Sequence, residues 1–247
     1  MQLTYIHHSG FLLETTVCTM LFDFVEGTLP ALPAGKPLYV FVSHTHPDHY
    51  TKKIFGIADA AARDHVPQVT FVLSDDVPEN DVPSALHDHT HFLKPHDTWK
   101  DALLQVETLV SNDTGVAFVI SVHGEKSSGT KGQDLQIYFA GDLNAWNWDG
   151  DEEDMALIRI YHEELARIKG QHFDIAFIPL DPRLGDEMIQ GITDFFDTCG
   201  CDATVVVPMH CWGQYDIIQK ARAMSDRYPY MERVLAIEKE GDTFPLF

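Results

Sequence analysis

The sequence predicts an α/β (α+β) fold in which two mixed β-sheets face each other and helices lie on the outer faces. Short apolar or alternating segments typical of strands occur in both halves of the 247 residues, with helix-like segments interspersed among them. Hydrophobic residues make up 45% of the chain, enough for a substantial core. Because no linker or short repeat divides the sequence, we expect one domain over residues 1–247.

The first hundred residues are predicted to form mainly strands. Their one helix-like segment is residues 52–63, where apolar residues recur at helical spacing and Thr51 is placed as the N-cap. Between residues 74 and 101, turn residues leave only short extended pieces. The strands expected here are residues 3–6, 11–16, 20–24, 38–43 and 69–73, with a Pro/Gly-rich loop at 26–37.

Later in the chain, strands give way to alternating helices and strands. Residues 124–132, rich in Ser, Lys and Gly, are typical of an exposed hairpin loop. The strands expected are residues 103–109, 116–122, 135–139, 175–178, 203–207 and 234–236, and the helices are residues 152–169, 186–198 and 215–227.

Composition narrows the expected partners and location. Lys and Arg number 17 against 38 Asp and Glu, a formal charge of -21 that repels nucleic acid. No apolar stretch is long enough to span a bilayer, and the N-terminus lacks the features of a signal peptide. We therefore expect a cytoplasmic protein that acts on a small-molecule substrate, with no nucleic-acid or membrane partner. The oligomeric state stays open, a homo-oligomer included.

The densest group of metal-competent side chains is His44-Thr45-His46-Pro47-Asp48-His49, which directly follows the apolar strand at 38–43. His44 and His46 lie two apart in an extended chain, so they project to one side and can share a metal. Asp48 and His49 follow the turn at Pro47 and suit a neighbouring second metal. Imidazole and carboxylate donors fit zinc, manganese or iron.

Two later strands end in the same way. Gly141-Asp142 follows one apolar strand, and His210 follows another. A carboxylate at such a position can bridge two cations, so Asp142 is the candidate bridge and His210 completes the second metal. Alone, Asp142 is typical of a turn or helix cap, and His210 of a hydrogen-bonded core histidine. Three strand ends that each carry a metal-competent residue favour a dinuclear site.

With these residues the chain resembles the metallo-β-lactamase-fold hydrolases. Its first hairpin, from Ile6-His7-His8-Ser9-Gly10 to Leu21-Phe22-Asp23, is similar to that of the branch containing ascorbate-phosphate lactonase-like proteins. The resemblance extends from the first strand to His210. It implies a four-layer αββα sandwich with a dinuclear site on one edge of the sheets. It also implies the same ligand division: His44 and His46 on one metal, the Asp48, His49 and His210 set on the other, and Asp142 between them.

The chain departs from this family at the first metal. The family supplies a third histidine from a loop that here corresponds to residues 109–116, which contain none. Asp113 offers an oxygen ligand instead, which would favour manganese or iron over zinc; alternatively, the first metal is weak or absent. The histidines between 87 and 96 offer other donors, although a structural or surface role is favoured for them.

Two further residues are candidates for substrate contact. The branch tends to carry a histidine near the metal edge at the position of His8, where it would orient substrate or a ligand; a buried hydrogen-bonded role is the alternative. Arg183 lies on a strand-to-helix loop and could pair with an anionic substrate group, the alternative being a surface salt bridge. Trp146, Trp148 and Trp212 follow ligand positions closely and could line the pocket or simply pack.

The expected activity is that of a metal-dependent hydrolase. Two divalent ions, with zinc favoured and manganese or iron as alternatives, would hold a hydroxide that attacks a small ester, lactone or phosphoester. Asp48 is the candidate catalytic residue, orienting this nucleophile. Three alternatives remain open: a nuclease, a diiron redox protein, and a non-catalytic metal-binding member of the fold.

Overall fold

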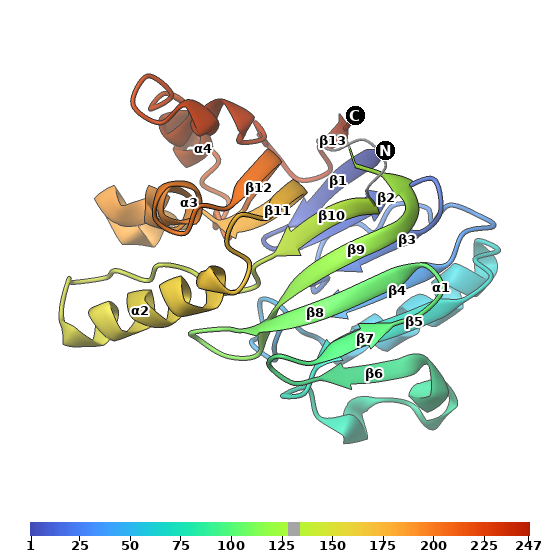
Figure 1. The fold of residues 1–247 in the computed structure, drawn as a ribbon. Helices are drawn as coiled ribbons and strands as arrows, with labels where there is room; N and C mark the ends of the chain where they lie inside the picture. The colour runs from blue at the N-terminus through green and yellow to red at the C-terminus, as the bar shows by residue number, and fades with distance from the viewer. Residues whose placement is uncertain (128–133) are drawn as a thin grey trace.

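The computed structural model describes residues 1–127 and 134–247. Within these ranges two mixed β-sheets, one of seven strands and one of six, face each other with helices outside them (Figure 1). The predicted fold class is therefore confirmed.

The first sheet has the strand order β13-β1-β2-β3-β4-β5-β6. Pairing is antiparallel from β13 to β3 and parallel from β3 to β6. Its strands are β1 (Gln2–His7), β2 (Gly10–Glu14), β3 (Thr19–Phe22), β4 (Leu38–Val42), β5 (Val69–Ser74), β6 (Thr90–Leu93) and β13 (Thr243–Pro245).

The second sheet has the order β12-β11-β10-β9-β8-β7. Pairing is antiparallel from β7 to β10 and parallel from β10 to β12. Its strands are β7 (Thr98–Lys100), β8 (Leu104–Val110), β9 (Val116–Lys126), β10 (Asp134–Phe139), β11 (His172–Pro179) and β12 (Asp202–Met209).

The helices cover the outer faces of both sheets. Side chains of α1 pack on the outer face of the first sheet, whereas those of α2, α3 and α4 join the core of the second. The α-helices are α1 (Ile57–Arg63), α2 (Glu152–Ala166), α3 (Gln190–Thr193) and α4 (Asp216–Arg222). Short 3-10 or π segments are η1 (Lys52–Gly56), η2 (Glu79–Asp81), η3 (Ser84–His89), η4 (Pro182–Ile189), η5 (Asp194–Thr198) and η6 (Pro229–Arg233).

Strand β4 is buried on both faces, which explains its unbroken apolar run. Tyr39 and Phe41 point between the two sheets, and Val40 points to the layer that contains α1. Between the sheets, Phe22 stacks on Phe41 at a centroid distance of 5.1 Å and on Phe139 of the opposite sheet at 4.7 Å. This aromatic layer fixes the two sheets against each other beneath the strand ends that carry the candidate ligands.

Several predicted boundaries are wrong. The helix predicted at 52–63 is divided into η1 and α1, and that at 186–198 into 3-10, α and π segments. The helix at 215–227 ends at Arg222, and residues 234–236 form a single bridge between Val206 and Val234 in place of a strand. Strands β6, β7 and β13 are three or four residues long, too short to show a clear alternating pattern.

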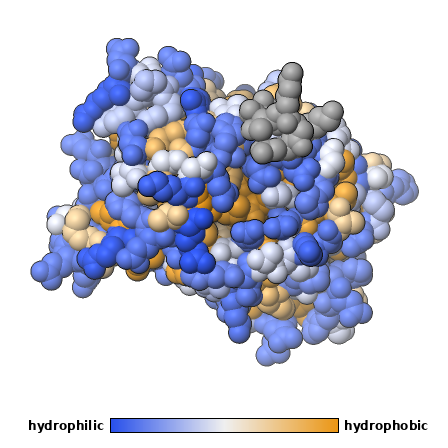
Figure 2. All heavy atoms as spheres, viewed as in Figure 1, coloured by the Kyte–Doolittle hydropathy of each residue, from blue (hydrophilic) through white to orange (hydrophobic). Residues whose placement is uncertain are grey.

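The hairpin loop predicted at 124–132 is also partly wrong, because β9 continues to Lys126. Residues 128–132 of that prediction lie outside the described residues. The face of the molecule in Figure 2 is largely hydrophilic, in keeping with the charge of -21. Among the described residues, no helix combines the length and apolar character needed to cross a membrane.

Candidate metal centre

The candidate ligands gather at one edge of the two sheets. The segment from His44 to His49 follows β4, Asp142 follows β10 and His210 follows β12. His8 lies in the tight turn between β1 and β2. Four loops that are far apart in the sequence therefore meet here, because the strand ends that bear them share an edge.

The donor atoms form two groups, in each of which they all lie within 4.8 Å of one another. We call them site A and site B. Site A comprises His44, His46, Asp113 and Asp142, and site B comprises His8, Asp48, His49 and His210. The structure thus brings Asp113 to the group where the expected third histidine is missing, and it brings His8 into the other group.

Asp142 lies between the two sites. Its Oδ1 is 3.2 Å from His49 Nε2 and 3.5 Å from His210 Nε2, whereas its Oδ2 is 3.4 Å from His44 Nε2. One oxygen therefore faces each group, the arrangement that a bridging carboxylate requires.

Five buried donor atoms in this cluster have no hydrogen-bond partner among the described residues. They are the Nε2 atoms of His8, His44, His49 and His210, and Oδ1 of Asp142. Buried polar atoms are rarely left unpaired, and here they converge on common points. This donor set, nitrogen and carboxylate oxygen, fits divalent metal ions.

The other side of each ring is held in place. His49 Nδ1 lies 2.7 Å from Asp23 Oδ2, His210 Nδ1 lies 2.8 Å from Asp181 Oδ2, and His44 Nδ1 lies 2.9 Å from Ser43 Oγ. When Nδ1–H donates to these oxygens, the lone pair of Nε2 points into the site.

Asp23 supports both sites, and sequence reasoning gave it no role. Its carboxylate is fully buried and accepts from the Ser43 amide at 2.8 Å and from the Ser43 hydroxyl at 2.6 Å, besides His49. Asp181 is also buried, and sequence reasoning gave it no role either. Both residues follow apolar strands, β3 and β11, as Asp142 follows β10. That shared placement is the signal that could have found them.

The buried charges compensate each other in the metal-free protein. Burial alone would raise the pKa of Asp142, but the charge of His49 and the imidazole of His44 beside the carboxylate hold that pKa well below its usual value. Burial opposes the charged form of His49, yet Asp142 and Asp23 raise its pKa well above 6.5. Protons on the imidazoles thus balance carboxylates that stay ionised, and a metal ion can take the place of those protons.

Asp48 and His8 differ from this pair. The pKa of Asp48 is lowered against the effect of its burial, because the imidazoles of His210 and His8 lie within 3.5 Å of its carboxylate and favour its charged form. Burial lowers the pKa of His8, which favours a neutral imidazole with a free lone pair.

Glycines allow the ligand loops to approach the end of β4. A Cβ added at Gly115 would lie 2.1 Å from the Ser43 carbonyl oxygen, and one at Gly141 would lie 2.7 Å from Ser43 Cβ. Both glycines also have positive φ. The loops of Asp113 and Asp142 can reach their positions only with glycine beside them.

Backbone strain is concentrated here. Six non-glycine residues of the described ranges have positive φ, and four of them lie at this edge. These four are His8 (φ 49°), Asp23 (φ 37°), His210 (φ 65°) and Trp212 (φ 49°). Such conformations persist where the surroundings impose them, and they are common at functional sites.

A cavity of about 1090 Å³ opens over the two sites. Side chains of both sites line it, together with the three tryptophans singled out in the sequence, Trp146, Trp148 and Trp212. Arg183 also lines it and pairs with Asp181. The alternative reading of Arg183, a salt bridge, is present, whereas pairing of Arg183 with an anionic substrate group stays a prediction.

The remaining candidate histidines lie elsewhere. His87 bonds to the carbonyl of Val82, His91 packs on Trp99, and His96 pairs with Glu164. None of them joins site A or site B. Their structural or surface role was the favoured prediction.

No protein-family model matches the chain, and no curated protein matches it in sequence. Solved structures do resemble it. Igni18, a metallo hydrolase from the archaeon Ignicoccus hospitalis, matches with a TM-score of 0.60 and 16% identity over 100% of this chain and 99% of its own. YhfI of Bacillus subtilis, a metallo-β-lactamase fold protein, matches at 0.58 with 15% identity over 98% of both chains.

A third solved structure, the isothiocyanate hydrolase from Delia radicum gut bacteria, matches with a TM-score of 0.55 and 18% identity over 100% of this chain and 99% of its own. At such identities the likeness shows the fold, and it agrees with the resemblance seen in the sequence.

Proposed function

We propose that this chain, which has the metallo-β-lactamase fold, is a metal-dependent hydrolase of a small ester, lactone or phosphoester. The observation that carries the proposal is the set of five buried, unpaired donor atoms that converge around Asp142. Buried donor atoms that lack hydrogen bonds cost stability, so their presence is best explained by ions that complete the cluster.

We propose two divalent ions, one in each site. Site B offers three imidazoles and one carboxylate, a set suited to zinc. Site A offers two imidazoles and two carboxylates, which suits zinc but also manganese or iron. In this arrangement His8 acts as a ligand through its unpaired Nε2, rather than as a contact for substrate.

Divalent ions bound here would polarise a substrate oxygen and make a water molecule acidic near neutral pH. The side chains of the protein would determine where the proton of that water molecule goes. Asp48 is the site B carboxylate that reaches the cavity, with 28% of its side chain exposed, and its Oδ2 lies 3.3 Å from His8 Nε2 and 3.5 Å from His210 Nε2. We assign Asp48 to hold the nucleophile's proton and to orient the attack.

The cavity suits a small molecule better than a nucleic acid. Among the described lining residues, Arg183 is the one Lys or Arg side chain, whereas Glu26, Asp48, Asp113 and Asp142 are acidic. A polyanion would find few phosphate contacts here.

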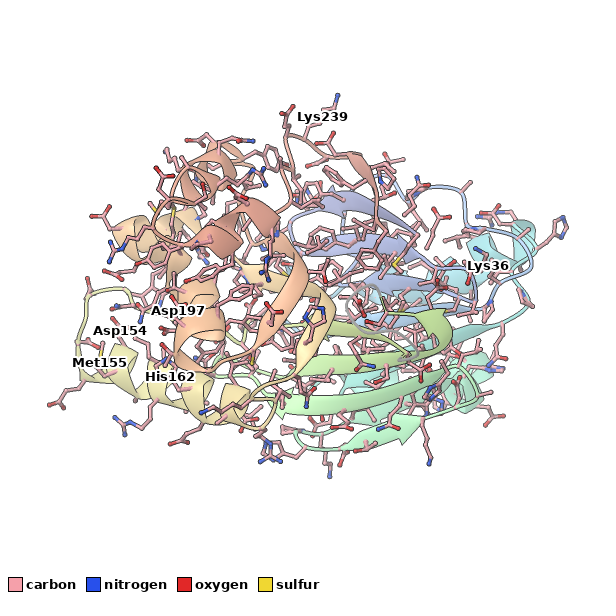
Figure 3. All side chains as sticks on the ribbon, turned by 45° about the horizontal axis from the view of Figure 1, so that its top comes forward. Lys36, Asp154, Met155, His162, Asp197 and Lys239 are labelled. Atoms are coloured by element: carbon pink, nitrogen blue, oxygen red, sulfur yellow. The ribbon has the colours of Figure 1, made fainter. Side chains whose placement is uncertain are left out.

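The test is metal analysis combined with a substrate panel. We expect purified protein to contain close to two divalent ions per chain and to lose turnover of esters, lactones or phosphodiesters on chelation. His46→Ala should lower both metal content and turnover. His162→Ala is the matched control, because His162 lies on α2 and pairs with Asp194 away from the centre (Figure 3). Activity that survives chelation and His46→Ala would contradict the proposal.

A further inference from the structure

A cation–aromatic stack stands at one wall of the cavity, and we call it the Arg183 clamp. The guanidinium carbon of Arg183 lies 5.3 Å from the ring centroid of Trp148 and 4.7 Å from that of Trp212. Both distances are within the range of cation–π attraction. All three side chains line the cavity over the metal centre.

The clamp is held rigidly on the Trp148 side. The carboxylate of Asp154, at the start of α2 (Figure 3), accepts hydrogen bonds from the amides of Trp148, Asp149 and Gly150 at 2.7–2.8 Å. Trp148 also stacks parallel on buried Trp146 at 5.5 Å, and the Trp146 indole donates to the Asp142 carbonyl at 2.8 Å. The position of Trp148 is therefore tied to the loop that carries the bridging carboxylate.

Asp181 holds the other side of the clamp. It accepts from Arg183 Nε and Nη2, from the Trp212 indole at 3.3 Å, and from His210 Nδ1 at 2.8 Å. One buried carboxylate thus connects the clamp to a site B histidine. The guanidinium is fixed as a fork, and its orientation does not have to be established on binding.

Part of the clamp is left free. Arg183 Nη1 has no hydrogen-bond partner among the residues that the structure describes, because Asp181 engages only Nε and Nη2. The residues Trp148 and Trp212 are 46% and 43% exposed, unusually open for tryptophan. A donor edge and the exposed parts of two tryptophan side chains therefore remain available at the cavity wall.

We propose that the Arg183 clamp is the subsite for an oxyanion group of a substrate with a flat apolar body. The oxyanion accepts hydrogen bonds from the free edge of Arg183, and the body packs against the exposed parts of the Trp148 and Trp212 side chains while the scissile group lies over the metal centre. This inference rests on the proposed function and narrows its substrate to anionic aryl or similarly flat compounds. A guanidinium suits carboxylate and phosphate equally well.

Binding of simple probes to the metal-loaded protein tests this directly. Benzoate and phenyl phosphate carry both the charge and the ring, benzamide lacks the charge, and acetate lacks the ring. Tryptophan fluorescence and calorimetry give Kd. We expect Arg183→Met to weaken benzoate or phenyl phosphate binding at least tenfold, with Arg183→Lys intermediate because it keeps charge without the fork. Arg227→Met is the matched control, since Arg227 lies over Tyr228 on the exposed surface.

Three further measurements make the proposal refutable. Trp148→Leu should weaken benzoate binding at least fivefold and leave acetate binding unchanged. If Arg183→Met loses its metal ions, the result for Trp148→Leu decides whether the proposal holds. Benzoate binding should persist, and still depend on Arg183, after chelation. The proposal is overturned if benzoate binds equally well to Arg183→Met and Trp148→Leu, or if benzamide binds as tightly as benzoate. Clamp-dependent binding without any metal-dependent turnover would contradict the hydrolase proposal alone.

Discussion

Replacing Asp23 with Asn tests how far the metal centre depends on the residues behind its ligands. Asp23 Oδ2 accepts from His49 Nδ1 at 2.7 Å and from the Ser43 hydroxyl at 2.6 Å. An asparagine can keep the hydrogen bond from the Ser43 amide, but its NH₂ group cannot accept a hydrogen bond from His49 Nδ1–H. His49 would then have to carry its proton on Nε2, the nitrogen that faces the site.

Loss of such an orienting carboxylate lowers metal affinity by about 10–100-fold, which is about 1.4–2.8 kcal/mol. Losing hydrogen bonds to a buried charge also costs about 2–3 kcal/mol of folding stability. For a chain of this size that corresponds to a fall in Tm of roughly 5–10 °C. Both effects should appear in Asp23→Asn.

The assays are competition with a chromophoric chelator for metal affinity and thermal unfolding, with and without chelator, for stability. Asp64→Asn is the control, because Asp64 accepts only the Leu32 amide in a distant loop. If Asp23→Asn bound zinc as tightly as the unaltered protein, the assigned orientation of His49 would be wrong.

Three other outcomes follow from the same geometry. Asp142 and Asp23 raise the pKa of His49 above 6.5, so zinc binding at pH 7 should release protons and should weaken as the pH falls. Calorimetry in buffers of different ionisation enthalpy measures this release, and zinc binding without any release of protons would contradict the prediction. Gly141→Ala, at φ 53° and with its Cβ 2.7 Å from Ser43 Cβ, should lower Tm by roughly 4–8 °C for a strain of about 2 kcal/mol, whereas Gly56→Ala, with nothing within 4 Å, should not. Asp113→His should raise the zinc-over-manganese selectivity of site A, measured by competitive loading, and an unchanged ratio would argue against Asp113 as a ligand.

The sequence was sufficient to predict the two-sheet architecture and the edge where the candidate ligands meet. The reason is that both depend on local patterns: apolar strands such as β4, and polar residues placed just beyond their ends. Strand direction then brings Asp142 and His210 to the same edge as residues 44–49. The pairing of His8 with site B was not predicted, because it depends on a turn with positive φ that no spacing rule encodes.

The carboxylates behind the histidines escaped prediction for a different reason. Asp23 and Asp181 each stand alone in the sequence, and a single Asp after a strand is usually a turn or cap residue. Their role appears only when His49 and His210, which lie 26 and 29 residues away in the sequence, are placed beside them. The helix predicted at 186–198 has the expected apolar spacing, but its hydrogen bonding changes from 3-10 to α to π along the segment, which residue spacing does not reveal; Gly185, with a non-helical φ of 58°, interrupts the 3-10 segment just before it.

The residues with left-handed backbone conformations at this edge lower folding stability while they position the side chains of the site. Each such non-glycine conformation costs about 1–3 kcal/mol, and His8, Asp23, His210 and Trp212 together account for a sum comparable to the whole stability margin of an ordinary domain. A laboratory selection for heat resistance alone should therefore enrich glycine at these four positions, and the metal centre would lose the side chains that form and support it. The His, Asp, His and Trp present at these positions therefore lower the folding stability of the chain while they build the centre and the cavity wall above it.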